Sequence, residues 1–382
     1  MLVQDIYNLN IFIDDLNLFE APGVVFSNAD IYESIANPVP VMTMEMIIPN
    51  GWMDGRTLSD GTKIKIQIQC ETLDLDAEYT FRLYNIKELE VMQNNVRINL
   101  EGILDFYDGY SSGNAYNLCG TSSEVFQKIA GTFGLNADID STNDKQLWVA
   151  GQKNIYQFFT YLAAYGWVDE TSGMFWCLDK NKTLLYKNLT TLFRNRQDKV
   201  YSFVQTPIPS KKNKEFGYSG VKGSIQAGTN NLRNDGYGGS DSYFDLKSYS
   251  WKQAKANKVV AESNIINVSK DLSKGLSQEW FSFDVGNHHA NYFKAYKQNR
   301  RVLSTYSTYA TLTTEFLQKY RLGEIVTLEY TDSKNVDNKL NSLSGTYMID
   351  AIHSQISLNN ISGIVEMVMQ GLNGKATTQE NY

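Results

Sequence analysis

The segments RLGEIVTLE (321–329), GTYMIDAIH (345–353) and VEMVMQG (365–371) decide how the rest of the chain is interpreted. Each segment places apolar residues at alternate positions, as β-strands with one face in a core do. The alternating residues are Val326 and Leu328, then Tyr347 and Ile349 with Ile352 three positions later, then Val365, Met367 and Met369. The stretch therefore predicts three strands, with a turn at Gly323 before the first and Gly371 after the last.

The N-terminal quarter of the chain carries the same pattern. Gly61 precedes Ile64 and Ile66 as Gly323 precedes the first of the three C-terminal strands. The further matches are Phe81, Leu83 and Ile86 with Tyr347, Ile349 and Ile352, and Val96, Ile98, Leu100 and Gly102 with Val365, Met367, Met369 and Gly371. Any two antiparallel β domains could share such alternation, but the matched glycines and the shared break in spacing favour a duplication. We predict two copies of one small β module.

A chain of 382 residues with 42% hydrophobic and 13% aromatic residues is expected to form two to four well-packed domains. The predicted fold is mainly β with α+β insertions: two β-barrel or sandwich modules and two smaller inserted domains. The predicted ranges are 1–108 for the first module, 109–190 for a small α+β domain, 191–225 with 301–373 for the second module, 226–300 for an inserted helical and loop domain, and 374–382 for a polar tail.

Local signals support these ranges. Alternation predicts strands at 10–14, 41–47, 62–70, 78–86, 95–106, 200–204 and 306–314, and a hairpin of 174–178 with 183–186. Thr121 and Glu124 have the spacing of a capping box, which starts a helix that ends at Gly134. Further helices are predicted from 155 to 166, from 251 to 264 and from 290 to 303.

Charge is distributed unevenly along the chain, although the net charge is only −7. Residues 1–108 hold 18 acidic and 6 basic side chains, whereas residues 194–301 hold 18 basic and 9 acidic ones. The basic region could bind nucleic acid or anionic lipid, or simply be a solvated surface. A third interpretation is that the acidic region of one copy docks beside the basic region of the next, because complementary charge orients association.

The sequence contains no recognisable catalytic or metal-binding motif. Nucleotide-binding glycine loops and nucleophile-elbow motifs are absent. Cys70, Cys119 and Cys177 lack metal or disulfide spacing and are expected to be small buried residues. His288 and His289 are expected to be a solvated pair at a helix start, and His353 a packed or edge-strand residue. We therefore expect neither enzyme activity nor a cofactor or metal, and the lack of a long apolar run predicts no membrane binding.

Two signatures resemble the baseplate hub proteins of contractile-tailed bacteriophages, a family that includes the late-control and spike-hub proteins of related injection systems. One is Ser122–Ala130 with Phe133-Gly134-Leu135, followed by the second helix and the hairpin. The other is Leu322-Gly323-Glu324-Ile325-Val326 followed by Gly345–His353. The resemblance covers most of the chain in order and spacing, with modest identity. Many relatives have a proline where this chain has Leu322.

The resemblance implies a homotrimeric ring that joins a sixfold tail tube to a threefold spike. Two tube-like modules per chain would place six similar modules around the ring, so that both symmetries are matched. The implied partners are a tail spike protein, a tail tube or tube-initiator protein, baseplate wedge proteins and a tape-measure protein, with DNA only in transit through the lumen. The implied location is the virion tail, after assembly in the host cytoplasm. Side chains that could face the channel or a neighbouring subunit are Lys63, Lys65, Gln67, Gln69, Thr327 and Glu329.

Two alternatives remain open at this point. A receptor- or glycan-binding tail protein could use exposed aromatic residues of the inserted region, such as Trp251 and Trp280. A virion-associated cell-wall hydrolase would need a pair of carboxylates in a cleft, and Asp74 with Asp76 or Asp14 with Asp15 could in principle supply one.

Overall fold

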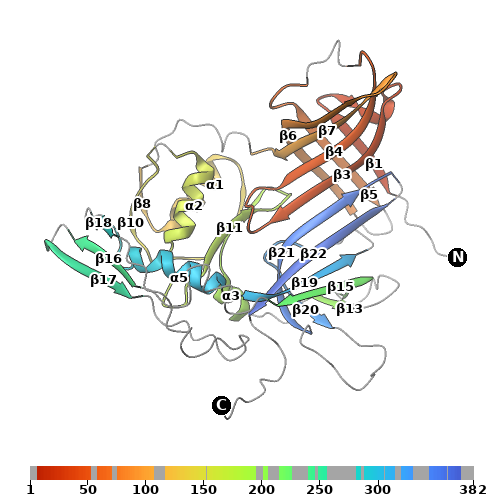
Figure 1. Cartoon of the computed structure of the whole chain (residues 1–382). Helices are drawn as coiled ribbons and strands as arrows, with labels where there is room; N and C mark the ends of the chain where they lie inside the picture. Colours follow the sequence, from red (N-terminus) through yellow and green to blue (C-terminus); the bar gives the residue numbers. More distant parts are fainter. Residues whose placement is uncertain are drawn as a thin grey trace, which may run out of the picture.

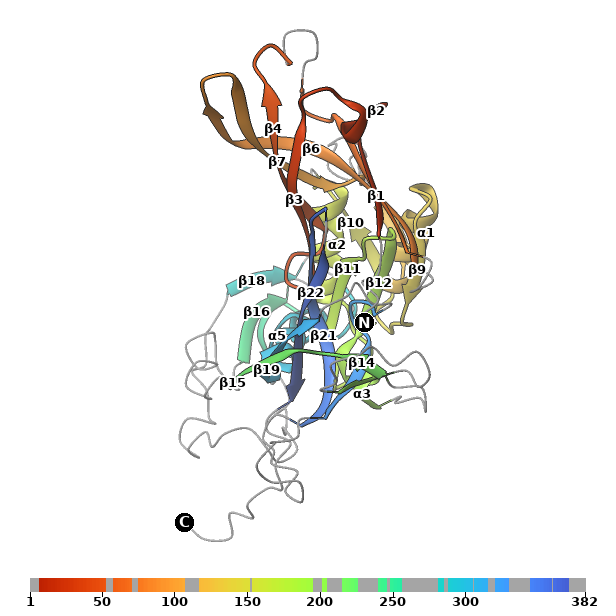
Figure 2. The same cartoon turned by 90° about the vertical axis from the view of Figure 1, so that its right-hand side faces the viewer.

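The computed structural model is mainly β, as predicted. It describes residues 7–52, 58–70, 75–106, 117–151, 153–194, 201–204, 215–225, 240–245, 248–255, 281–284, 288–304, 306–314, 320–329, 344–358 and 360–370. In Figures 1 and 2 the N-terminal strands, coloured red and orange, form an upper module, and the blue C-terminal strands lie below it. The helices pack beside the two modules in Figure 1.

The first module is an antiparallel sheet in the order β3-β4-β7-β6-β5-β1-β2. Its elements are β1 (Asn8–Ile13), β2 (Leu16–Asn17), a 3-10 turn (Leu18–Glu20), β3 (Val25–Ser34), β4 (Val41–Pro49), β5 (Lys63–Cys70), β6 (Leu75–Val91) and β7 (Asn95–Leu104). Five of these strands match predicted ranges within a few residues. The residue pattern of β3 did not predict a strand, yet β3 joins the two modules.

The second module has the strand order β15-β19-β22-β21-β20-β13-β14. Its strands are β13 (Tyr201–Val204), β14 (Glu215–Gly217), β15 (Gly220–Ile225), β19 (Tyr306–Thr314), β20 (Ile325–Glu329), β21 (Gly345–Ile356) and β22 (Ile361–Gln370). All neighbours are antiparallel except that β13 runs parallel to β14 and to β20.

The long strand β21 connects the modules into one 14-stranded sheet. One edge of β21 pairs with β22 through residues 348–356. The other edge pairs first with β20, through residues 345–348, and then with β3, through residues 351–356. The modules are therefore joined by backbone hydrogen bonds between β21 and β3, which lie side by side in both views (Figures 1 and 2).

The helical part contains the predicted capping box and a second one. Its elements are β8 (Asn117–Gly120), α1 (Ser122–Thr132), β9 (Asn136–Ile139), β10 (Gln146–Val149), α2 (Ile155–Tyr165), β11 (Met174–Leu178), β12 (Thr183–Asn188), α3 (Leu189–Arg194) and α5 (Tyr292–Ser304). Thr121 and Glu124 cap α1 reciprocally, and Asn154 and Gln157 cap α2 in the same way. The helix α5 begins within the range assigned to the inserted domain, yet it packs against α2.

The prediction of a helix at 251–264 is wrong for its described part. Ser250–Lys255 is the strand β17, paired with β16 (Ser240–Asp245), which also pairs with β18 (Phe281–Asp284). The turn between β16 and β17 includes Tyr249 at φ 48, which reverses the chain and brings the two strands together. Cross-strand pairing therefore overrides the weak helical spacing of Trp251 and its neighbours.

Candidate functional site

The turn before the repeated strands has the same hydrogen bonds in both modules. The Gly61 amide donates to the Leu83 carbonyl at 2.8 Å, and the Gly323 amide donates to the Ile349 carbonyl at 2.9 Å. The return bonds, from the Leu83 amide to Thr62 and from the Ile349 amide to Glu324, measure 2.8 and 3.0 Å. Both glycines have positive φ, 85° and 71°.

The strands that follow these turns also pair in the same register. Ile64 lies opposite Phe81, as Val326 lies opposite Tyr347. We call each pair of reciprocal bonds a glycine clamp. Directly after the clamped residue, Leu83 or Ile349, each long strand has a β-bulge, between Leu83 and Asn85 in β6 and between Ile349 and Ala351 in β21. A bulge bends its strand at that point, so both long strands change direction at the same place relative to their glycine turn.

The third pair of strands is displaced from the sequence alignment by four residues. Gly102 lies opposite Leu83, but the residue opposite Ile349 is Met367. Gly102 is therefore matched by Met367 in the structure, and Gly371 lies outside the described residues. A Cβ atom at Gly102 would lie 2.9 Å from Met42 Cε and 3.1 Å from Phe81 Cβ, so tight packing explains this glycine better than a turn does.

Most residues predicted to form the cores of the two modules are buried. Ile64, Ile66, Phe81, Leu83, Ile98 and Leu100 belong to one hydrophobic cluster, and Val326, Leu328, Tyr347, Ile349, Ile352, Val365, Met367 and Met369 belong to another. Ile86 and Val96 are half-buried against the first cluster. The first cluster also contains the cores of α1 and α2, so the helical part shares its core with the first module.

The polar face of β5 is held by contacts with β6. Gln67 donates to Glu78 at 2.8 Å, Gln69 donates to Asp76 at 3.2 Å, and Lys65 Nζ lies 3.8 Å from Glu78. The backbone amide of Lys63 donates to Asp14 at 3.0 Å. Thr327 is half-buried on β20, and the side chain of Glu329 lies outside the described residues. The face carries both signs of charge, and its ion pairs are partly exposed.

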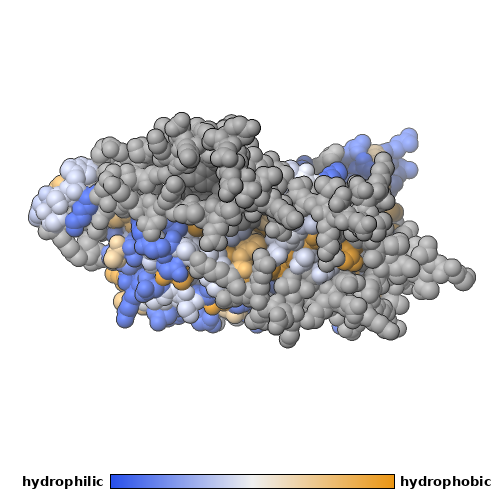
Figure 3. Space-filling view, turned by 90° about the horizontal axis from the view of Figure 1, so that it is seen from below, coloured by the Kyte–Doolittle hydropathy of each residue, from blue (hydrophilic) through white to orange (hydrophobic). Residues whose placement is uncertain are grey.

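This polar face continues across the junction between the modules. His353 Nε2 of β21 lies 3.3 Å from Asp30 Oδ1 of β3, and its ring packs edge-on against Tyr32. His353 is thus a half-buried residue of a paired strand. Seen from below (Figure 3), the coloured surface is largely hydrophilic, with hydrophobic areas gathered towards its centre.

A buried ion pair ties the helical part to the junction. Glu33, on β3, is 1% exposed, and its Oε2 lies 3.0 Å from Lys180 Nζ in the turn between β11 and β12. The Lys180 amide donates to Glu33 Oε1 at 2.8 Å, and the ammonium also lies over the Tyr79 ring. Burial has the largest single effect and lowers the pKa of Lys180, but the charge and hydrogen bond of Glu33, together with Tyr79 and Tyr320, outweigh it and raise that pKa.

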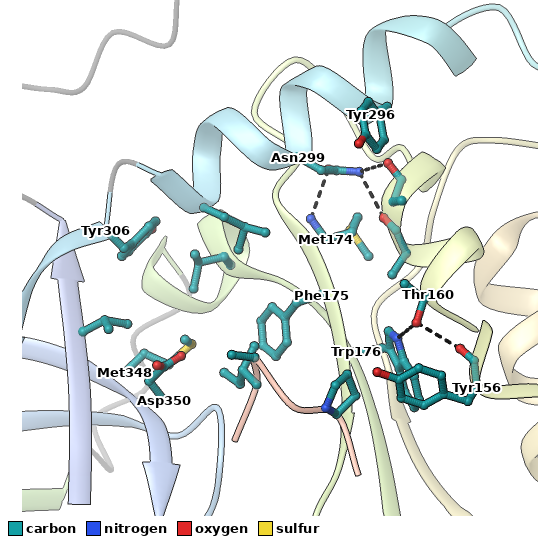
Figure 4. A pocket seen from close by; sticks show the side chains of 18 of the residues that line it. Tyr156, Thr160, Met174, Phe175, Trp176, Tyr296, Asn299, Tyr306, Met348 and Asp350 are labelled. Atoms are coloured by element: carbon teal, nitrogen blue, oxygen red, sulfur yellow. Dashed lines mark hydrogen bonds between the residues drawn. The ribbon is translucent and has the colours of Figure 1, made fainter. Parts of the chain in front are cut away.

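A cavity of about 460 Å³ lies where the second module meets the helical part (Figure 4). Its walls come from the helices α2, α3 and α5, the strands β11, β19, β21 and β22 and the segment 35–38, and they are mostly apolar. Asn299 of α5 forms one side: its amide donates to the carbonyls of Ala163, Ala164 and Gly166 at 2.9–3.1 Å, and its oxygen accepts from the Met174 amide at 3.1 Å. These bonds satisfy carbonyls at the end of α2 that lack helical partners.

Asp350 is the acidic residue of this cavity. It projects from β21 beside Met348 in Figure 4. Burial raises the pKa of Asp350 to about 6, and the nearby charge of Glu366 adds to the rise. A carboxyl with a raised pKa can mark a catalytic site, but the described walls supply no histidine or cysteine partner.

The residues that could carry chemistry are dispersed. Cys70 and Cys177 are buried, as predicted, but Cys119 is exposed, which corrects that expectation. His288 and His289 precede α5 but are half-buried: His288 stacks on Tyr292, and the amide of His289 donates to Gln146 at 2.8 Å. Asp76 is bound by Gln69, and Asp74 and Trp280 lie outside the described residues. Within the described ranges no cluster of three or more His, Cys, Asp or Glu side chains could hold a metal ion.

None of the described helices has the length and apolar character needed to cross a bilayer. Trp251 is 57% exposed on the small sheet of β16, β17 and β18, with its ring edge-on to Phe244. Of the two tryptophans named for the glycan-binding alternative, Trp251 is the described one, and it is exposed.

Comparisons with known proteins identify the fold. No protein-family model matches the sequence, and no curated protein matches it. The chain is similar in structure to a 43 kDa tail protein of a prophage from Shewanella oneidensis, with a TM-score of 0.57 and 10% identity over 95% of this chain and 98% of the other. It is also similar to a tail protein from Neisseria meningitidis, with a TM-score of 0.56 and 9% identity over 95% and 97% of the two chains.

A third similar structure is a component of the type VI secretion system of E. coli, which is itself described as similar to tail proteins of bacteriophage T4. Its TM-score is 0.50 at 8% identity, over 96% of this chain and 77% of the other. At these identities the likeness establishes a shared fold. This chain therefore shares the fold of these two tail proteins and of the secretion-system component over nearly its whole length.

Proposed function

We propose that this protein is a structural baseplate hub of a phage-type tail, which assembles as a homotrimeric ring between a sixfold tail tube and a threefold spike. The observation that carries the proposal is the pair of β modules with matching glycine clamps, registers and bulges. Three chains with two such modules each can present six similar surfaces to a sixfold tube. The fold shared with phage tail proteins supports the same role.

The proposed partners follow from this position in the tail. One end of the ring would contact the tail tube or its initiator, and the other the spike, while baseplate wedge proteins would surround it. The tape-measure protein and then DNA would pass through the lumen without lasting binding. The mixed charges of the β5 and β6 face suit such passage, because a uniformly basic wall would hold phosphates strongly.

The proposed role is non-enzymatic and located in the virion, after assembly in the host cytoplasm. The scattered positions of the histidines and cysteines support a structural role. We also keep the domain ranges predicted from the sequence as part of this proposal, with α5 packed on the α+β domain.

The mass of the purified full chain tests the proposal. Light scattering is expected to give a trimer, and class averages from electron microscopy are expected to show a ring with a central opening and six similar lobes. A dimeric or tetrameric particle, or a trimer without an opening, would contradict the hub role.

A second candidate is a glycan-binding tail protein, which the exposure of Trp251 favours. An indole face beside Phe244 could stack on a sugar ring. Binding of the full chain to an array of bacterial surface glycans, lost on Trp251→Ala with the oligomeric mass unchanged, would support this candidate. If the chain binds no glycan, the glycan-binding candidate is excluded and the hub role is the remaining proposal.

A further inference from the structure

The junction between β21 and β3 offers a template for contacts between chains. In this junction the second half of β21 pairs with β3, the outer strand of the first module. By strand order and register, β21 of the second module corresponds to β6 of the first, and β3 of the first module corresponds to β15 of the second. The equivalent junction would therefore join β6 to β15.

Neither of these strands has that neighbour within the chain. On the edge facing β5, β6 pairs only through residues 75–82, and in the described ranges no strand covers its remaining part, 85–91. Among the described strands β15 pairs only with β19, through one edge. In Figures 1 and 2 β6 lies in the upper module and β15 in the lower one, so a single chain does not bring them together. Strand edges with free N–H and C=O groups are the usual sites of sheet extension.

We propose that the 85–91 edge of β6 pairs antiparallel with β15 of a second copy of this chain. This proposal rests on the proposed function and names the contact that would close the ring. Each chain would offer both edges, so the interface is head-to-tail, and rotation by a third of a turn closes it after three copies. Each of the six boundaries between modules would then be a strand pair of one kind.

The register follows from rows of residues across the two sheets. One row of paired residues crosses β6, β7, β4 and β3 in the first module: Ile86, Leu100, Met44 and Ala29. The equivalent row crosses β21, β22, β19 and β15 in the second module: Ile352, Val365, Leu312 and Val221. Ala29 of β3 therefore corresponds to Val221 of β15. The tips of the hairpins also match, since the Met92 amide donates to Asn95 at 2.8 Å and the Ser357 amide donates to Asn360 at 2.9 Å. Val91 therefore corresponds to Ile356, the last paired residue before the tip.

This register predicts chemically suitable pairs. Within the chain Ile356 lies opposite Ala29, so Val91 would lie opposite Val221 of the next copy. Val91 is 70% exposed in the single chain, which is unusual for a valine and is relieved by such a pair. Gln355 lies opposite Asp30, so Glu90 would lie opposite Lys222, and both of these side chains are exposed. Opposite charges across strands favour the proposed register.

Cysteine cross-linking tests the pairing in the full-length chain. A background of Cys119→Ser removes the exposed thiol, and the other two cysteines are buried. Co-expressed Val91→Cys and Val221→Cys chains are expected to form a covalent dimer on mild oxidation, and neither variant alone should do so. The double variant should give a covalent trimer. A control double variant, Val91→Cys with Gly223→Cys, is displaced by two residues and should cross-link much less.

Light scattering of the same samples separates this proposal from the proposed function. A trimeric mass with in-register cross-links supports both. A trimeric mass without them, or with equal cross-linking in the control, overturns the strand pairing and leaves the hub role. A mass other than a trimer overturns both.

A reciprocal charge exchange gives a second measurement. Glu90→Lys and Lys222→Glu should each raise the concentration at which the trimer dissociates by about 2- to 5-fold, as expected for exposed pairs. The variant with both Glu90→Lys and Lys222→Glu should return the dissociation concentration of the trimer towards that of the unmodified chain. Equal weakening in the single and double variants would count against the register.

Discussion

The amide of Gly323 donates a hydrogen bond to the carbonyl of Ile349, and the amide of Ile349 donates back to the carbonyl of Glu324. Gly61 and Leu83 form the same two-bond clamp with Thr62 in the other module. The clamp fixes where the short strand starts relative to the bulge of the long strand. It therefore sets the register from which each module is built.

Alanine at either clamp glycine should destabilise the fold, because both glycines have a positive φ. At φ of 85° and 71° a Cβ atom is strained by its own backbone, although neither position has a neighbouring atom closer than 3.7 Å. Gly61→Ala and Gly323→Ala should each lower the free energy of unfolding by about 1–2 kcal/mol. Urea unfolding followed by tryptophan fluorescence measures this. Gly131→Ala, inside α1 with open space around it, should instead stabilise by about 0.5–1 kcal/mol. A neutral effect at one clamp only would show that the two turns are not equivalent.

Removing one partner of the Glu33–Lys180 pair should be costly, because the other charge stays buried. Glu33→Gln or Lys180→Met should each lower the free energy of unfolding by about 3–5 kcal/mol. The combined Glu33→Leu and Lys180→Met variant should lose less than either single variant, since it leaves no unpaired charge. Lys87→Ala, which breaks the exposed Lys87–Glu101 pair, should change stability by less than about 1 kcal/mol. Chemical unfolding of the four variants distinguishes these values, and equal losses at both pairs would refute the argument.

The buried glutamate also explains why the sequence did not reveal β3. Alternation in this strand brings Ala29, Ile31 and Glu33 to one face, and a charged residue at a core position hides the pattern. A bulge between Phe26 and Asn28 interrupts the alternation further. Nothing in the local sequence announces Lys180, which lies 147 residues away. By contrast, alternation with no charge at a core position was enough to predict β5, β7, β19 and β20.

The candidate site was predictable only in part. Glycine spacing gave the first two strands of each module, because a turn that needs positive φ selects glycine strongly. The third strand was misaligned by four residues, since repeated alternation looks the same after any even shift. The free edges of β6 and β15 depend on which strands pair, so they required the structure. The sequence around Val91 does not distinguish this exposed valine from a valine in the core.

Loss of the Asn299 side chain should loosen the contact between α5 and α2. Asn299→Ala leaves the carbonyls of Ala163, Ala164 and Gly166 without this donor, and should lower the free energy of unfolding by about 2–3 kcal/mol. Asn299→Asp should cost at least as much, because a carboxylate would face those carbonyls. Hydrogen exchange should show faster exchange in α2 and α5, while β4 and β7 stay protected. Uniform loss of protection would indicate a general rather than a local effect.

The contribution of Asp350 to the stability of the chain should fall as the pH rises from about 4 to about 6. The folded chain holds this proton up to a pKa of about 6, whereas an unfolded aspartate loses it near pH 4. Below pH 4 the Asp350 carboxyl is protonated in both the folded and the unfolded chain, so it does not affect stability. Between pH 4 and 6 the carboxyl ionises in the unfolded chain first, which favours unfolding. Above pH 6 the loss of folding free energy from Asp350 has reached its full value. Asp350→Asn should therefore stabilise by about 1–3 kcal/mol at pH 7.5 and by nearly nothing at pH 4. Glu366→Gln should recover a smaller part of this gain, because it removes only the repulsive charge. Urea unfolding between pH 4 and 8 checks both variants, and a gain from Asp350→Asn that does not depend on pH would disprove the assignment.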